Sequence, residues 1–399
     1  MNGPGQDRPR PAPLNPTAAG LAPSKIVEVW QMGFDVENLI ALFVGEGDEP
    51  TPAFISDAAA RALADGRTFY TPKRGIPELR RALSDYLSRH FGAAVDAERI
   101  TVTSSGMNAI MLTLQAVLAP GTSLVAPTPV WPNVLSAAEI AGGHVKTVPM
   151  TVLPEGGFKL DLDRLFDACD ETARALFIVS PSNPTGWVIS REEQEAVLAF
   201  CRRRGLWLIA DEVYHRFVFD PARFPAGVAP SFLEIAEADD PLVVVNSFSK
   251  AWCMTGWRQG WLVHPPALGD ILGNLIEYNT SGGQSFLQAG CLAALSEGEP
   301  FVESLVARCG QAAEMVFQQL ASLPRVSLAR PAASFYAFFR VDGIDDSLAF
   351  AKRILAETGV GLAPGSAFGA AGEGHLRLCF AGSPAHLAAG LDRLRPVLS

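Results

Sequence analysis

The stretch ALFIVSPSNPTG, residues 175–186, passes from five apolar residues directly into a turn of serine, proline, asparagine and glycine. A short run of Leu, Phe, Ile and Val without polar alternation is typical of a strand that is buried on both faces. Similar runs occur at residues 100–103, 124–126, 206–210 and 242–245. Helical patterns, for example at 108–118 and 191–204, lie between several of these runs. The sequence therefore predicts an α/β fold in which helices flank a mainly parallel sheet.

The last hundred residues follow a different pattern. They read as a long helix at 300–323, a strand at 334–341 and a helix at 347–357. A glycine-rich turn at 359–374, a strand at 375–380 and a closing helix follow. This order predicts a smaller α+β domain. We therefore expect residues 1–24 to form a disordered or extended arm that could lie on a neighbouring subunit. We expect residues 51–294 to form a large domain, and residues 25–50 together with 295–399 to form a small domain.

Composition and charge narrow the possible functions. Of the 399 residues, 48% are hydrophobic and 19% are charged, which excludes a mostly disordered protein. The net charge of −10 argues against nucleic acid as a partner, because binding its phosphates needs a basic surface. The six cysteines form no CxxC pair, so we expect no metal site and no disulfide framework, and a cytoplasmic location fits best. No apolar stretch approaches about 18 residues and no signal-peptide pattern is present, so no membrane association is expected.

Each of the five predicted strands is followed by residues that could bind a ligand. The carboxyl ends of parallel strands meet at one edge of an α/β sheet, and ligands bind there. In chain order, the loops supply a helix start of small residues (Ser105 and Gly106), an aromatic ring (Trp131) and an amide (Asn183). They also supply a carboxylate with a phenol (Asp211 and Tyr214) and a lysine (Lys250). Pyridoxal phosphate needs such a set. Its aldehyde binds an amine, its pyridine nitrogen needs a carboxylate, and its phenolate oxygen and phosphate need hydrogen-bond donors.

Six motifs carry a resemblance to a known family. In chain order they are FVGEGD (43–48), FYTPKRGIPELRRAL (69–83), SPSNPTG (180–186), DEVY (211–214), SFSKAWCMTGWRQG (247–260) and HLRLCF (375–380). From about residue 25 onward the chain resembles the class I/II pyridoxal-phosphate aminotransferases of fold type I, and most closely their bacterial aspartate-aminotransferase-like branch. The resemblance implies a large domain that binds the cofactor, a small domain that closes over the substrate, and a homodimer with shared active sites.

The resemblance also implies three catalytic residues. Lys250 bonds to the cofactor aldehyde and, once released by substrate, moves the proton between the substrate Cα and the cofactor. Burial beside other cations would lower its pKa and make the amine a better nucleophile. Asp211 pairs with the protonated pyridine nitrogen, and Tyr214, together with Asn183, donates to the phenolate oxygen.

Other residues that match the family motifs are implied to bind the phosphate, the ring and the substrate. The phosphate contacts are the backbone N–H groups and side chains of Ser105, Gly106, Met107, Ser247, Ser249, Arg258 and, from a second subunit, Tyr70. Trp131 stacks on the ring. The substrate contacts are Gly45, Trp131, Asn183 and Arg377, and the planar fork of Arg377 holds the α-carboxylate.

Three departures from the family pattern bear on the substrate. The segment GEGDE (45–49) lacks the proline and the aromatic residue of the usual GEPDF, Met107 stands where aspartate-specific relatives have lysine, and Ala333 replaces a glycine. These differences favour a neutral or aromatic amino acid as the amino donor. From the family alone we expect a 2-oxo acid, such as 2-oxoglutarate, as the acceptor in a ping-pong cycle.

Three alternatives stay open from the sequence. A carbon–sulfur β-lyase of the same fold also begins by removing the Cα proton and differs only in the leaving group. A phosphate- or dinucleotide-binding module would need a GxGxxG motif after the first strand, which is missing, and it gives Lys250 no role. A catalytically silent regulatory relative is the third, although we expect the N-terminal segment to be too short for an added DNA-binding domain.

Overall fold

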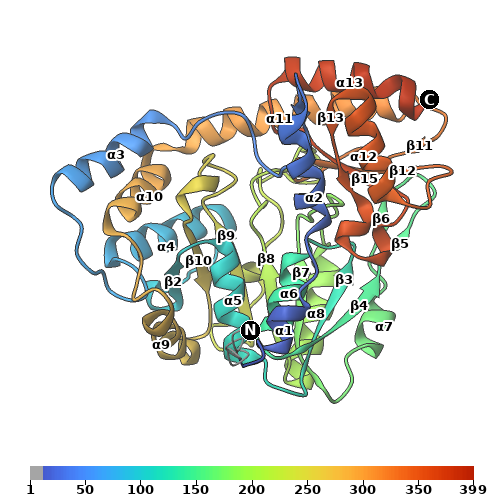
Figure 1. Ribbon diagram of the computed structural model, residues 1–399. Helices are drawn as coiled ribbons and strands as arrows, with labels where there is room; N and C mark the ends of the chain where they lie inside the picture. The colour runs from blue at the N-terminus through green and yellow to red at the C-terminus, as the bar shows by residue number, and fades with distance from the viewer. Residues whose placement is uncertain (1–11) are drawn as a thin grey trace, which may run out of the picture.

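A seven-stranded sheet forms the centre of the larger part of the molecule in the computed structural model, which describes residues 12–399 (Figure 1). Across the sheet the strands are β2 (Ile100–Thr103), β10 (Gly260–Val263), β9 (Leu242–Ser247), β8 (Trp207–Asp211), β7 (Ala173–Val179), β3 (Ser123–Thr128) and β4 (His144–Pro149). Strand β10 runs antiparallel to the other six strands, which all run in one direction. The five predicted strands are confirmed with ends that shift by at most two residues, and the mainly parallel sheet is confirmed with them.

Helices cover both faces of this sheet, which explains why its strands read as unbroken apolar runs. Along β3, the side chains of Leu124 and Ala126 pack on one face and that of Val125 packs on the other. The first face is covered by α5 (Gly106–Val117), α6 (Asn133–Ile140) and α9 (Gly269–Asn279). The second face packs against α4 (Pro77–Phe91), α7 (Leu162–Asp167) and α8 (Arg191–Arg204). The predicted helices at 108–118 and 191–204 correspond to α5 and α8.

The C-terminal residues form a second, antiparallel sheet with its own helices, as the sequence predicts. Its strands are β11 (Val326–Ser327), β12 (Tyr336–Val341), β15 (His375–Cys379) and β14 (Ala363–Pro364), in that spatial order. The helices of this part are α11 (Glu299–Leu320), α12 (Ser347–Thr358) and α13 (Pro384–Leu398). In Figure 1 these elements, in orange and red, lie together above the large sheet.

The prediction of a glycine-rich turn at 359–374 is wrong in part. This segment contains β13 (Val360–Gly361), β14 and two 3-10 helices, η6 (Gly365–Phe368) and η7 (Ala370–Gly372). Its glycines permit close packing rather than flexibility: a Cβ at Gly361 would overlap the ring of Phe43, and one at Gly365 would overlap the carbonyl of Gly372. The glycine content of a sequence does not tell whether its glycines allow a turn or allow close packing.

The N-terminal residues cross from the large part to the small part. Strand β1 (Ile40–Ala41) pairs in parallel with β13, and α2 (Lys25–Met32) contributes Val29 to the core. The pairing supports the expected union of residues 25–50 with the C-terminal domain, although the domain boundaries themselves stay predictions. Of the predicted arm, residues 1–11 lie outside the described residues. The expectation of extended chain is wrong for α1 (Pro16–Gly20), a short helix whose first turn is capped by Asn15.

The remaining elements lie between those already named. They are α3 (Ala53–Ala64), α10 (Ser285–Glu297), the hairpin of β5 (Thr151–Val152) and β6 (Phe158–Lys159), and the 3-10 helices η1 (Gly33–Asp35), η2 (Ala97–Arg99), η3 (Phe232–Glu234), η4 (Thr255–Trp257) and η5 (Pro266–Leu268). Helix α10 packs against α3 and α4. Between residues 12 and 399, none of the helices has the length and apolar character needed to cross a membrane.

Candidate active site

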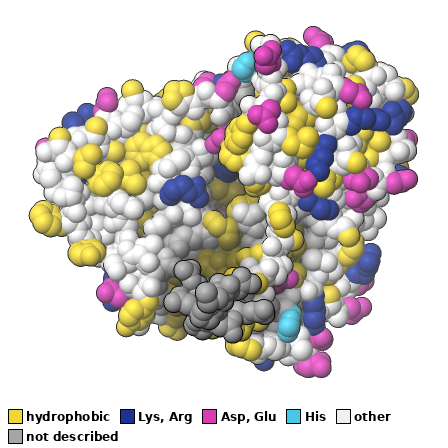
Figure 2. Space-filling view, viewed as in Figure 1, with side chains coloured by type: hydrophobic (Ala, Val, Ile, Leu, Met, Phe, Trp, Pro, Cys, Tyr) yellow, Lys and Arg dark blue, Asp and Glu magenta, His cyan; other side chains and the backbone are white. Residues whose placement is uncertain are grey.

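A cavity of about 410 Å³ lies at the edge of the large sheet where β3, β7, β8 and β9 end. Figure 2 shows a hollow in the middle of the molecule with hydrophobic side chains inside it. The structure brings most of the predicted site residues to this cavity, namely Gly45, Gly106, Met107, Trp131, Asn183, Asp211, Tyr214, Ser247, Ser249, Lys250, Arg258 and Arg377. Ser105 lies just behind its wall, and Tyr70 lies elsewhere.

Lys250 follows β9 and reaches the cavity from the large-sheet side. Its Nζ donates a hydrogen bond to the backbone carbonyl of Gly45 at 2.6 Å, so the amine also touches the small part of the molecule. Burial lowers the pKa of Lys250 to about 8, and the positive charges of Arg377 and Arg258 act in the same direction. At pH 7 roughly a tenth of such amines is neutral, which makes Nζ able to act as a nucleophile or to accept a proton.

Asp211 ends β8 inside the cavity wall and is 6% exposed. Its Oδ1 accepts a hydrogen bond from the backbone N–H of Val213 at 3.1 Å, and no partner for Oδ2 is found within residues 12–399. Burial raises the pKa of the Asp211 carboxyl to about 6, while the positive charge of Lys250 opposes that shift. A protonated ring nitrogen placed beside this carboxylate would satisfy the free oxygen and return the pKa toward its ordinary value.

Tyr214 directly follows Val213, and the hydroxyl of a second tyrosine lies within hydrogen-bond distance of its own. The phenolic oxygens of Tyr214 and Tyr336 are 2.8 Å apart, and both rings are buried. Burial raises the pKa of Tyr214 well above its ordinary value, so this phenol is a neutral hydrogen-bond donor at physiological pH. Sequence reasoning missed Tyr336, whose only signal is a phenol within the apolar FYAFF segment.

The start of α5 is shaped to bind an anion. Ser105 caps the helix by accepting a hydrogen bond from the N–H of Asn108 at 2.9 Å, and its φ of +149° is a strained value for a residue with a side chain. The N–H groups of Gly106 and Met107 have no acceptor in the part of the chain that the structure describes. A Cβ at Gly260 would lie 2.6 Å from the nitrogen of Gly106, so β10 can approach this helix start only with glycine there.

Hydroxyl and guanidinium groups adjoin this helix start. The hydroxyls of Ser247 and Ser249 are 2.9 Å apart, and the Arg258 guanidinium lines the same cavity. Free N–H groups at a helix start, hydroxyls and an arginine form the donor set that binds phosphate. No group of residues between 12 and 399 has the ligands for a metal ion.

Arg377 lies in the centre of the small sheet and is 3% exposed. Its Nη1 donates to Oδ1 of Asn183 at 2.9 Å, and its guanidinium lies 4.5 Å from the centre of the Tyr336 ring. Its Nε is buried, and no acceptor for it occurs in the described part of the chain. A buried cation with a free donor is suited to bind a carboxylate. Because Asn183 uses its oxygen for Arg377, its Nδ2 is left free to donate.

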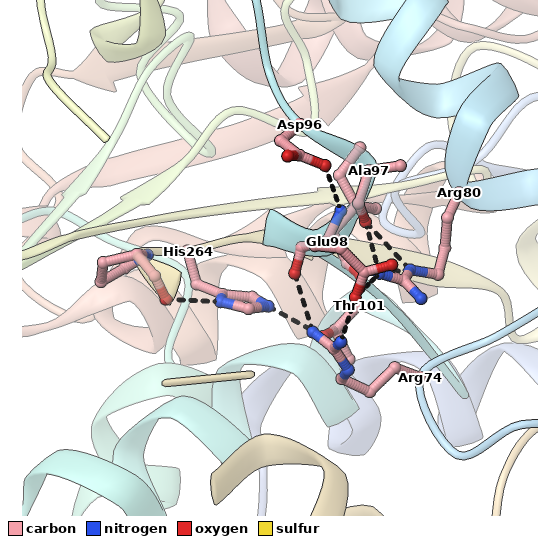
Figure 3. Close-up of polar contacts among 9 residues, drawn as sticks. Arg74, Arg80, Asp96, Ala97, Glu98, Thr101 and His264 are labelled. Atoms are coloured by element: carbon pink, nitrogen blue, oxygen red, sulfur yellow. Dashed lines mark hydrogen bonds and ion pairs between the residues drawn. The ribbon is translucent and has the colours of Figure 1, made fainter. Parts of the chain in front are cut away.

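Tyr70 is the one predicted site residue that lies away from the cavity. It is 91% exposed, beside Phe69, in a separate hollow lined by residues 68–70 and 280–286. Four residues further along the chain, Arg74 donates a hydrogen bond to Glu98, and nearby Thr101 contacts His264 (Figure 3). Tyr70 therefore lies on the outer surface of this chain and does not line the cavity.

The donors of the cavity fit pyridoxal phosphate one by one. The Lys250 amine at this cavity could take an aldehyde, Asp211 has an oxygen without a hydrogen-bond partner among residues 12–399 for a ring nitrogen, and the first N–H groups of α5 could bind a phosphate. Half-buried Trp131 supplies a ring at the same cavity. The sequence missed two further groups of lining residues, Glu46 beside Gly45, and the α2 residues Ile26, Val27 and Trp30. Their position depends on how α2 docks, which no local motif encodes.

Residues 37–394 match the model of the family "Aminotransferase class I and II". The aspartate/prephenate aminotransferase of Thermus thermophilus is 33% identical over 390 residues, covering 96% of this chain and 97% of that protein. The crystal structure of the Thermus thermophilus aspartate aminotransferase with maleate superimposes with a TM-score of 0.89 at 32% identity, covering 97% of this chain and all of that one. An aromatic aminotransferase from Pyrococcus horikoshii superimposes with a TM-score of 0.85 at 31% identity, covering 94% and 98%.

The names of these relatives support amino-group transfer rather than the carbon–sulfur lyase alternative. The superpositions assign the fold to type I, in agreement with the sheet and the small antiparallel domain. The chain thus belongs to the class I and II aminotransferases, enzymes that use pyridoxal phosphate to transfer amino groups.

Proposed function

We propose that this cavity takes the amino group of an L-amino acid and passes it to a 2-oxo acid in a ping-pong cycle, with Lys250, Asp211 and Tyr214 as the catalytic residues. One observation carries the proposal. A lysine with a lowered pKa, a buried carboxylate with a free oxygen and a buried arginine with a free donor all line one cavity of about 410 Å³. Perturbed groups gathered in a cleft are typical of active sites.

Each part of the cofactor has a matching set of residues. The phosphate would be held by the start of α5, Ser247, Ser249 and Arg258, while Trp131 covers the ring. Asp211 would hold the ring nitrogen, and Tyr214 with Asn183 would donate to the phenolate oxygen. When bound, pyridoxal phosphate supplies an aldehyde that accepts amines and a protonated ring that withdraws electrons from the substrate Cα.

The chain's own groups then orient the substrate and move its proton. Arg377 binds the α-carboxylate and so fixes the direction of the Cα–H bond. Lys250 Nζ would remove the Cα proton of the bound substrate, and the lowered pKa keeps part of the amine neutral for this step. The carbonyl of Gly45, 2.6 Å from Nζ, would accept a hydrogen bond from the protonated amine until the amine passes the proton to the cofactor.

The two substrates are an amino acid and a 2-oxo acid. The Thermus relative is named for aspartate and prephenate, and the Pyrococcus relative for aromatic amino acids. Met107, which stands in place of a lysine, favours a neutral or aromatic donor in this chain. We propose 2-oxoglutarate as the first acceptor to test.

We also propose that the enzyme is a homodimer whose two active sites are shared. Phe69, Tyr70 and Tyr278 are 84%, 91% and 89% exposed, and so much bare aromatic surface is typical of an interface. A cytoplasmic location is proposed because all six cysteines are free thiols.

The test uses the purified chain reconstituted with pyridoxal phosphate. The protein should hold a visible absorption band after gel filtration, and Lys250→Ala should abolish that band. The common amino acids are then tested with 2-oxoglutarate, and formation of glutamate supports the proposal. Stoichiometric pyruvate with free ammonia from cysteine, in the absence of any oxo acid, would instead identify a lyase.

A further inference from the structure

Helix α2 presents an apolar face to the cavity. Ile26, Val27 and Trp30 all line the cavity, whereas Val29 is fully buried in the core, against which Ile26 also packs. This spacing places the three lining residues on one helical face. None of these three α2 residues is among the site residues that the sequence predicted.

The helix is held firmly enough to present that face. Glu28 forms an ion pair with Lys352 of α12, and Ser24 caps the first turn. Trp30 packs edge to face against Phe34, with 4.8 Å between the ring centres, yet it stays 41% exposed. A large indole ring left open at a cavity gains free energy when an apolar group covers it.

Helix α5 adds a second apolar wall. Met107 and Ile110, three residues apart on one face of α5, line the same cavity. Ile110 is 1% exposed, and Met107 is half-buried. Methionine adapts its shape to apolar and aromatic ligands, which suits a wall that contacts a substrate side chain.

The charges of the cavity disfavour an acidic side chain. Its cations among the described residues are Lys250, Arg258 and Arg377, and each already serves a group common to all substrates or to the cofactor. Two carboxylates also line the cavity: Asp211, proposed for the ring nitrogen, and Glu46, whose Oε2 accepts a hydrogen bond from Thr255 at 2.7 Å. Within the lining that this chain supplies, a second substrate carboxylate would therefore meet a like charge and no free cation.

We propose that Ile26, Val27 and Trp30, together with Met107 and Ile110, form the side-chain subsite and select large apolar or aromatic amino acids as donors. The inference rests on the proposed function, because Arg377 must hold the α-carboxylate for the side chain to reach this subsite.

The test measures binding of three unreactive acids to the enzyme loaded with pyridoxal phosphate. Hydrocinnamate carries an aromatic side chain, propionate a short one and succinate a second carboxylate. Isothermal titration calorimetry should give hydrocinnamate at least about tenfold tighter binding than succinate. Trp30→Ala should weaken hydrocinnamate about tenfold more than it weakens propionate, and Trp30→Phe should restore most of that difference. Ile26→Ala is the second variant and should act in the same direction.

Met32→Ala is the matched control. Met32 lies at the end of the same helix and is 40% exposed, but it does not line the cavity. Its substitution should leave the preference for hydrocinnamate unchanged.

The two proposals fail in different ways. The subsite is overturned if succinate binds as tightly as hydrocinnamate. It is also overturned if both α2 variants lose as much affinity for propionate as for hydrocinnamate. In either case the proposed function survives if Arg377→Ala still abolishes binding of every acid. If no acid binds, or if Arg377→Ala has no effect, the proposed function fails together with the subsite.

Discussion

The phenolic oxygens of Tyr214 and Tyr336 lie 2.8 Å apart and join the DEVY loop of the large domain to β12 of the small domain. The Tyr336 ring in turn lies beneath Arg377, with 4.5 Å between the guanidinium carbon and the ring centre. The residue proposed for the cofactor oxygen and the residue proposed for the substrate carboxylate therefore share one neighbour. A Cβ at Gly45 would collide with the Tyr336 hydroxyl, so the glycine is needed for this arrangement.

Tyr336→Phe should change the titration of the bound cofactor. When Tyr214 accepts a hydrogen bond from Tyr336, its own O–H becomes a stronger donor to the cofactor oxygen. Without that bond the anionic oxygen is stabilised less, so the midpoint of the pH-dependent change in visible absorption should rise by roughly 0.3 units. Tyr214→Phe should raise the midpoint further. An identical midpoint in wild type and Tyr336→Phe would show that Tyr336 only packs.

Asp211 should make cofactor binding depend on pH. Burial raises its pKa to about 6, so the carboxyl is protonated and neutral below pH 6 and ionised above it. Only the ionised form can accept a hydrogen bond from a protonated ring nitrogen without losing a proton first. Affinity for pyridoxine phosphate, which has no aldehyde, should therefore rise about tenfold between pH 5 and pH 7 through this group.

Asp211→Asn provides the reference for that measurement. The ligand phosphate ionises in the same pH range, so the difference between wild type and the variant reports on Asp211. Fluorescence titrations at several pH values give both curves. Parallel curves would mean that the carboxyl does not contact the ring nitrogen.

Arg377→Ala should raise KM for amino acids about 100-fold, because it removes a charge-assisted pair of hydrogen bonds to the α-carboxylate. Arg377→Lys should recover only part of the loss, since an ammonium cannot keep both the substrate and Asn183 in one planar fork. Steady-state kinetics with a saturating 2-oxo acid measure both variants. Arg353, an exposed arginine on α12, is the matched control for loss of charge, and an unchanged KM in Arg377→Ala would refute the assignment.

Most of the large domain could be predicted because its chemistry is local. The unbroken apolar run before Asn183 follows from burial on both faces of β7. Asp211 is the last residue of β8, and Lys250 lies three residues after the end of β9. Parallel strands then bring these loops to one edge. The order of residues along the chain was sufficient to place them.

The remaining site residues depend on contacts between distant segments. Tyr336 reaches Tyr214 only because β12 pairs with β15 and the small domain docks on the large one, and Trp30 reaches the cavity only through the docking of α2. The glycine at 361 reads as a turn residue but is required by the ring of Phe43. These are properties of packing, and no sequence period encodes them.

Tyr70 and Lys250 should complement each other across subunits. Tyr70 is 91% exposed and lies in a hollow separate from the cavity, so in one chain it cannot contact the cofactor. A Tyr70→Ala chain retains Lys250, and a Lys250→Ala chain retains Tyr70, so a mixed dimer contains one complete site out of two. Random pairing of equal amounts gives half mixed dimers, and activity should recover to about one quarter of wild type. Two affinity tags allow the mixed dimer to be isolated and assayed alone. If tagged mixed dimers form and stay as inactive as the parent variants, Tyr70 does not serve the site of the other subunit, and its exposed ring has only an interface role.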